Sequence, residues 1–182
     1  MNESKQPLST VVFIDDEPNR IRFYIRAVKA RGYQTHVLQD TDDAWEYFQE
    51  PRPDVCAVVL DIMMPPGKHL ADAAHVGGTR TGVFLYRRIL EQMAIQAIHR
   101  HSIPIAVLTQ VNDPETLKML QEVQLEHRPD ERFEVWSKHG LDPDDFADQF
   151  ETWLEAVKEL YGEPAQGTTQ PEATRRSGCD GA

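Results

Sequence analysis

The sequence predicts an α/β domain built on a doubly wound, five-stranded parallel sheet. Two observations support this fold class. Short apolar runs typical of buried parallel strands alternate five times with segments in which apolar residues recur at helical spacing. In addition, 182 residues with 40% hydrophobic content can bury one core and leave some chain over, so a single domain with polar ends is expected.

The first half of the chain is expected to supply three strands and two helices. Asn19 can cap the first helix, which carries Ile21, Ile25 and Val28 on one face and ends at Gly32. Two prolines, Pro51 and Pro53, then separate the second helix from the third strand. The other expected elements are strands at 11–14, 34–38 and 55–60 and a helix at 41–48.

The second half is expected to contain two more strands and three helices. Asn112 and Asp142 each precede a helix that has a proline near its first position, where the missing N–H group costs nothing. The expected segments are strands at 103–108 and 133–136 and a third helix at 82–100. The last helix has the longest apolar stripe, formed by Phe146, Phe150, Trp153, Val157 and Leu160.

The segment 65–81, between the third strand and the third helix, is predicted to be an irregular loop because it contains two prolines and three glycines. It is long for a connection in an α/β domain. One hypothesis makes it a lid or a partner-contact element beside the third strand. Its residues His69, Asp72 and His75 could instead bind a metal, although their spacing matches no known ligand pattern.

Composition sets the remaining boundaries. Residues 1–9 form a polar leader, 10–162 the folded domain, and 163–182 a tail expected to be disordered because Pro, Gly, Thr, Gln and Ser dominate it.

The net charge of −11 argues against direct binding to nucleic acid or to anionic membranes, since both reward basic residues. Without a membrane-spanning apolar run or a secretion signal, a cytoplasmic location is expected. Cys56 and Cys179 suggest no disulfide framework.

Polar side chains recur at one kind of place, the carboxyl end of a predicted strand. Asp15 and Asp16 follow the first strand, Asp61 the third, Thr109 the fourth and Lys138 the fifth. Because the carboxyl ends of parallel strands meet at one edge of a sheet, these side chains are expected to share a cleft. Each alone has a plain structural explanation, such as helix capping, but five at successive strand ends favour a site.

The residue types in this cleft predict a particular chemistry. Clustered carboxylates that leave room for water are the ligands that Mg²⁺ prefers. Lys138 and Thr109 could bind a phosphoryl oxygen, one by charge and the other by a hydrogen bond. Asp61, ionised and close to a metal and a lysine, could then attack phosphorus and become an acyl phosphate.

The sequence also resembles the receiver domain of bacterial two-component response regulators. The resemblance covers about residues 10–160 and rests on five motifs: Ile14-Asp15-Asp16-Glu17, Leu60-Asp61-Ile62-Met63-Met64-Pro65, Gly82 opening the third helix, Leu108-Thr109 and Ser137-Lys138. It implies a flavodoxin-like (βα)₅ fold in which Asp61 accepts a phosphoryl group from a sensor histidine kinase or a phosphotransfer protein.

The resemblance also implies roles for the other site residues. Asp16, Asp61 and the backbone carbonyl of Met63 would hold Mg²⁺, and Asp15 would act mainly through water. Thr109 and Lys138 would contact the phosphoryl group and relay its presence to a downstream protein target. The kinase, the target and the oligomeric state cannot be deduced from the sequence.

Several positions depart from the receiver pattern. His139 follows the lysine where receivers usually have proline, so no cis peptide bond is expected there. Val135 stands where a switching aromatic residue is usual, and its neighbour Trp136 is expected on the opposite face of the strand. Gln110 is bulkier than the usual small residue after the threonine. The two positions that can orient an attacking water in the family hold Met63 and Val111.

Three functions therefore compete. The first is a single-domain, phosphorylation-controlled switch that is not an enzyme beyond the phosphorylation and dephosphorylation of its own aspartate. The second is a pseudo-receiver, an adaptor that keeps the fold but works without phosphorylation. The third is an aspartate-nucleophile phosphatase of the haloacid-dehalogenase type, for which Asp15 and Glu17 have the right spacing but Asp61 would have no role.

Overall fold

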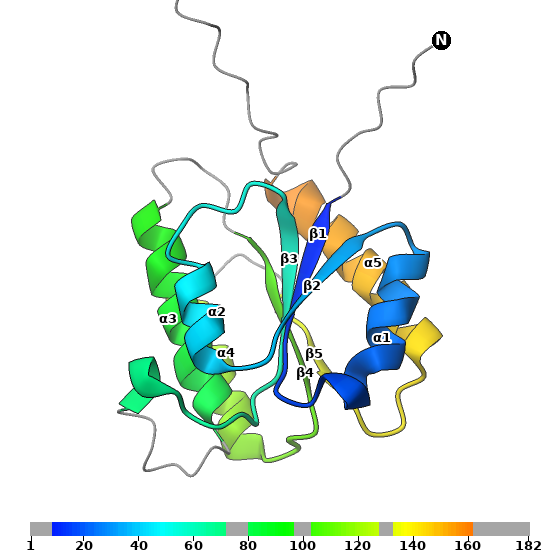
Figure 1. Ribbon diagram of the computed structural model, residues 1–182. Helices are drawn as coiled ribbons and strands as arrows, with labels where there is room; N and C mark the ends of the chain where they lie inside the picture. The colour runs from blue at the N-terminus through cyan, green and yellow to red at the C-terminus, as the bar shows by residue number, and fades with distance from the viewer. Residues whose placement is uncertain (1–8, 72–79, 97–102, 128–132, 162–182) are drawn as a thin grey trace, which may run out of the picture.

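The computed structural model describes residues 9–71, 80–96, 103–127 and 133–161. Five strands and five helices alternate along this part of the chain. Figure 1 shows the sheet in the middle, with α2, α3 and α4 on one face and α1 and α5 on the other. The predicted doubly wound fold is confirmed. None of the helices in the described ranges is long and apolar enough to cross a membrane.

The sheet is parallel and has the strand order β2-β1-β3-β4-β5. The strands are β1 (Thr10–Ile14), β2 (Gln34–Leu38), β3 (Val55–Leu60), β4 (Ile105–Thr109) and β5 (Val135–Ser137). The helices are α1 (Pro18–Ala30), α2 (Thr41–Tyr47), α3 (Thr81–Gln96), α4 (Pro114–His127) and α5 (Pro143–Tyr161). The predicted third helix extends to 100, but residues 97–102 lie outside the described residues.

Burial explains why the central strands are apolar throughout. Every residue of β1, β3 and β4 is buried, because helices cover both faces of the sheet. Successive side chains point to opposite faces, so Val58 and Leu60 join the core under α2, α3 and α4, whereas Ala57 and Val59 join the core under α1 and α5. The edge strand β2 alternates between exposed and partly buried residues instead.

Some sequence-based assignments were wrong in detail. Helix α1 begins at Pro18 with Glu17 at the N-cap, so Asn19 lies inside the helix and is not its cap. Its buried face is formed by Ile21, Tyr24, Ala27 and Val28. Leu160, near the end of α5, is 61% exposed and does not extend the apolar stripe. Strands β4 and β5 each begin two residues later than predicted.

The described start of the connection after β3, up to residue 71, contains regular structure where an irregular loop was predicted. Residues 68–71 form a 3₁₀ turn, and its Leu70 is buried in the core. The Asp42 carboxylate at the start of α2 accepts hydrogen bonds from the amides of Lys68 (3.0 Å) and His69 (3.0 Å). A Cβ at Gly67 would collide with this carboxylate, so glycine permits the docking. The start of the loop is therefore fixed on α2.

The predicted metal ligands of this loop are only partly visible. His69 lies 3.4 Å from a carboxylate oxygen of Glu46, which gives it a side-chain partner on α2. Asp72 and His75 lie outside the described residues, as do the predicted leader up to residue 8 and the predicted disordered tail. The metal hypothesis for this loop therefore stays a prediction.

Cys56 gives a test of how tightly β3 is packed. Burial raises the pKa of its thiol to about 11, so only about a thousandth of it is ionised at pH 8. In a Cys179→Ser variant, the remaining thiol should react with a disulfide reagent at pH 8 far more slowly in the native state than in urea. Equal rates in the two states would contradict the buried placement.

Candidate functional site

Asp61 lies at the carboxyl end of β3, and its main chain is an extension of the sheet. Its amide donates a hydrogen bond to the carbonyl of Ile14 at 2.9 Å, which places it beside the end of β1. The side chain turns back over its own backbone, and Oδ1 accepts from the amides of Ile62 (2.6 Å) and Met63 (3.2 Å). This geometry fixes one carboxylate oxygen of a buried aspartate.

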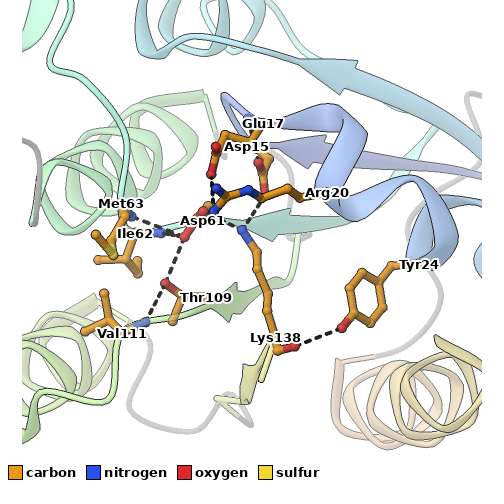
Figure 2. A network of polar contacts seen from close by, with 10 residues as sticks. All are labelled: Asp15, Glu17, Arg20, Tyr24, Asp61, Ile62, Met63, Thr109, Val111 and Lys138. Carbon is orange, nitrogen blue, oxygen red and sulfur yellow. Dashed lines mark hydrogen bonds and ion pairs between the residues drawn. The ribbon is translucent and has the colours of Figure 1, made fainter. Parts of the chain in front are cut away.

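Two further donors reach Asp61 from the ends of β4 and β5, as Figure 2 shows. The hydroxyl of Thr109, at the end of β4, donates to Oδ1 at 2.8 Å. The Lys138 ammonium follows β5 and donates to Oδ2 at 2.5 Å. The same ammonium also donates to Oδ2 of Asp15 at 2.6 Å, so it bridges two buried carboxylates.

Asp15 and Asp16 complete an acidic cluster with Asp61. Ligand oxygens of the three residues lie within 4.8 Å of one another. Oδ1 of Asp15 also accepts from the amide of Glu17 at 2.9 Å. Burial raises the pKa of Asp15 above its ordinary value, although Lys138 opposes this shift, and burial also raises the pKa of Asp16.

Lys138 is the counter-charge of the cluster. Its side chain is only 7% exposed. Burial alone would lower its pKa, but the charges of Asp61 and Asp15 together outweigh burial and raise the pKa above the ordinary lysine value. The ammonium therefore stays protonated at neutral pH.

The donor set fits the predicted Mg²⁺. All candidate ligand atoms are hard oxygens, and three carboxylates face a single ammonium, which leaves the cluster with negative charge. Asp16 is half-buried and has no side-chain partner within the described chain, so its carboxylate is free to bind a cation. The structure thus brings together the five predicted side chains, and Met63 lies directly beside them.

Gly82 allows helix α3 to approach this site. A Cβ at position 82 would collide with the backbone carbonyl oxygen of Asp61, and its amide donates to the carbonyl of Ile62 at 2.9 Å. Glycine is therefore required by a close approach of two backbones. The motif residue that opens the third predicted helix is explained by this contact.

Tyr24 of α1 is a site residue that sequence reasoning missed. Its hydroxyl has a single hydrogen, which the carbonyls of Lys138 (3.2 Å) and Leu141 (3.0 Å) share in a bifurcated hydrogen bond, and burial raises the pKa of Tyr24 above the ordinary value. Its spacing from Ile21 and Val28 indicates a core position and nothing more. The sequence offered one indication of this role: a tyrosine on the buried face of a helix needs a hydrogen-bond partner for its hydroxyl.

The departures from the receiver pattern have clear positions. Val135 and Trp136 point to opposite faces of the sheet, as predicted, and Trp136 packs against α5 by an edge contact with Phe146 at 5.1 Å. Gln110 is exposed. Met63 is 43% exposed beside Asp61. No cis peptide bond occurs in the described ranges, the bond before His139 included.

Comparison with known proteins shows what this architecture is similar to. No protein-family model matches the sequence, and no curated protein matches it either. Among solved structures, a receiver domain protein from Methanospirillum hungatei superposes with a TM-score of 0.59 at 11% identity, covering 84% of this chain and 98% of that one. The chain has the receiver fold.

Two further structures agree. A two-component response regulator from Clostridium difficile gives a TM-score of 0.56 at 11% identity and covers 81% of this chain and 96% of that one. A receiver domain of a histidine kinase from Syntrophus aciditrophicus gives 0.56 at 15% identity and covers 88% of this chain and 97% of that one. This receiver fold therefore spans nearly the whole described chain, whereas its sequence is far from those of the matched structures.

Removing the central cation tests the electrostatics of the site. We expect Lys138→Met to lower the free energy of unfolding by about 3 kcal/mol at pH 7, because it leaves buried carboxylates without a counter-charge. In this variant the pKa of Asp15, already raised by burial, should rise further. The folded state then binds protons before the unfolded state as the pH falls, so the loss of unfolding free energy relative to the wild type should shrink towards pH 4.

Urea unfolding at both pH values measures this difference. Lys68→Met is the matched control, because Lys68 pairs with Glu46 at 2.8 Å on the surface and its loss should leave stability nearly unchanged. A Lys138→Met deficit that is equal at pH 4 and pH 7 would show that packing, and not charge, is responsible.

Proposed function

We propose that this protein is a phosphorylation-dependent signalling switch of the two-component type, in which Asp61 accepts a phosphoryl group. The supporting observation is the convergence of Thr109 and Lys138 on the two different oxygens of the Asp61 carboxylate. A buried aspartate in any role needs donors, but here the two donors come from the ends of β4 and β5, and they hold the two carboxylate oxygens separately. The receiver fold places these groups at the sheet edge where ligands of open α/β sheets bind.

The contacts assign separate tasks to the two carboxylate oxygens. Oδ1 is held by two backbone amides and the Thr109 hydroxyl, whereas among the described residues Oδ2 accepts a hydrogen bond from Lys138 alone, so Oδ2 is the oxygen that attacks phosphorus. The new O–P bond replaces the P–N bond of a phosphohistidine, whose electron pair returns to the imidazole nitrogen. Lys138 can then move from Oδ2 to a phosphoryl oxygen and keep a charge-assisted hydrogen bond.

The acidic cluster supplies the metal ligands in this proposal. Asp16, Asp61 and the backbone carbonyl of Met63 would hold Mg²⁺, and Asp15 would act through water. When bound, Mg²⁺ neutralises negative charge that develops on the transferred group. Asp15 has a second task that is visible in its contacts, because it holds the Lys138 ammonium next to Asp61.

The phosphodonor in this proposal is a sensor histidine kinase or a phosphotransfer protein, and the output is a contact with a downstream protein target. The protein would act in the cytoplasm without binding nucleic acid directly, as its charge of −11 favours. It would catalyse only the phosphorylation and dephosphorylation of its own Asp61.

The phosphatase alternative has less support. It needs Glu17 as a partner of Asp15, but the Glu17 carboxylate pairs with Arg20 at 2.9 Å and is largely exposed. The pseudo-receiver alternative predicts the same fold and differs only in chemistry. Phosphorylation in vitro distinguishes the pseudo-receiver from the proposed phosphorylation-dependent switch.

Intact mass measures this directly. After incubation with Mg²⁺ and acetyl phosphate or phosphoramidate, the wild type should gain one phosphoryl group and Asp61→Asn should gain none. Asp43→Asn, which removes an exposed carboxylate of α2, should be labelled like the wild type. Omission of Mg²⁺ should abolish labelling, because the ion neutralises the developing charge.

The outcomes separate the competing functions. Equal labelling of the wild type and Asp61→Asn would refute Asp61 as the acceptor. Absence of labelling, with a cognate kinase as donor as well, would favour the pseudo-receiver. Continuous release of phosphate from a phosphomonoester would favour the phosphatase.

A second prediction concerns the lifetime of the phosphorylated state. The phosphoaspartate should persist for hours in the purified protein, because neither Met63 nor Val111 has a side chain that can orient an attacking water. Met63→Asn should shorten this lifetime by adding a polar group beside Asp61, whereas Met63→Leu should not. Decay of the wild type within seconds, followed by mass spectrometry, would refute the prediction.

A further inference from the structure

We infer that Tyr24 is a positioning residue for Lys138, and that its hydroxyl sets the rate of phosphoryl transfer by fixing the backbone from which the lysine extends. Its effect on phosphorylation rests on the proposed function, whereas the positioning itself does not. Tyr24 contacts no reacting atom. It acts through the main chain of the β5–α5 connection, residues 138–142.

The backbone of Lys138 is held on both sides. Its amide donates to the carbonyl of Thr109 at 2.8 Å, which ties it to β4. Its carbonyl accepts from the Tyr24 hydroxyl at 3.2 Å, which ties it to α1. The same hydroxyl shares its single hydrogen with the carbonyl of Leu141 at 3.0 Å, so both ends of the connection meet at one group. Figure 2 shows Tyr24 extending from α1 towards Lys138.

Among the described residues, the other contacts of this connection do not hold the Lys138 carbonyl: the amide of His139 donates to Ser137 Oγ at 3.2 Å, and Leu141 packs against the core under α1 and α5. Strand β5 has only three residues, and its register with β4 ends at Ser137. Gly140 has a φ of 74°, a left-handed conformation that glycine adopts without strain. A lysine side chain has several rotatable bonds, so an ammonium that must meet two carboxylates depends on a fixed Cα. The Tyr24 hydroxyl supplies that constraint.

Tyr24 is itself rigidly placed. The residue is 7% exposed, and its ring meets Phe146 of α5 edge-on at 5.3 Å. It belongs to α1, the helix that follows Asp15 and Asp16 within two residues. Helix α1 therefore begins directly after the acidic residues Asp15 and Asp16. One to two turns later, its Tyr24 holds the backbone of Lys138, the lysine that neutralises them.

The test compares Tyr24→Phe with Tyr33→Phe. Both substitutions remove one hydroxyl and keep the ring, and the ring of Tyr33 also packs edge-on against α5, at 5.9 Å from Phe150. In the described chain, the Tyr33 hydroxyl makes no hydrogen bond to residues 138–142. Three quantities are measured for each variant: the phosphorylation rate with phosphoramidate, Mg²⁺ affinity by titration, and hydrogen–deuterium exchange of peptides that cover 137–142.

We expect Tyr24→Phe to slow phosphorylation by roughly three- to tenfold, the kinetic equivalent of one lost hydrogen bond, with Mg²⁺ affinity unchanged. Exchange in 137–142 should become faster, and Tyr33→Phe should match the wild type in all three measurements. A wild-type rate together with wild-type exchange would overturn the inference. An equal fall in rate and Mg²⁺ affinity would also overturn it, because that result indicates general disruption of the site.

Failure of the proposed function gives a different result. If the wild type itself is not phosphorylated, hydrogen–deuterium exchange alone tests whether Tyr24 positions Lys138. Faster exchange in 137–142 for Tyr24→Phe but not for Tyr33→Phe would support positioning of Lys138, and unchanged exchange would overturn it.

Discussion

One ammonium organises this end of the molecule: Lys138 forms two ion pairs and so bridges the buried carboxylates of Asp15 and Asp61. Buried charges are costly unless they are paired and hydrogen-bonded, so the elements that carry them must be held in fixed positions. Asp15 and Asp61 come from the ends of β1 and β3, whereas the lysine follows β5. The cost of separating these charges therefore couples segments that are far apart in sequence.

The register of the sheet makes this pairing possible. Ile14 of β1 lies opposite Leu60 of β3, so the next residues, Asp15 and Asp61, emerge side by side at the same edge. In the sheet, β2 lies on one side of β1 and β3 lies on the other, so the chain changes direction across the sheet between these strands. Ligands of doubly wound sheets bind at such a switch point. A shift of one residue in this register would turn the aspartates to opposite faces. The apolar pattern of β1 and β3 thus fixes the site as well as the core.

The sequence was sufficient for whatever depends on local periodicity. Strand and helix order follow from alternating apolar patterns, and the grouping of Asp61 with Thr109 and Lys138 follows from parallel topology alone. The contacts that sequence reasoning missed are long-range, whereas the misplaced N-cap of α1 is a local error. Tyr24 finds its acceptors 114 and 117 residues away, and no local pattern predicts such contacts. Asp42 gains its role from a loop whose backbone docks on its carboxylate, and Leu160 is exposed although it continues the helical stripe of α5.

The charge of the cluster explains why the position of the lysine matters so much. Three carboxylates and one ammonium leave two negative charges in a partly buried site, which a divalent cation would neutralise. Under the proposed function, a phosphoryl group would add negative charge to the same place, and Lys138 would pair with it. A displaced ammonium would then leave either Asp15 or the phosphoryl oxygen without its partner. The Tyr24 hydroxyl, which ties the lysine backbone to α1, therefore acts on the electrostatics of the site through the position of Lys138 and not through a charge of its own.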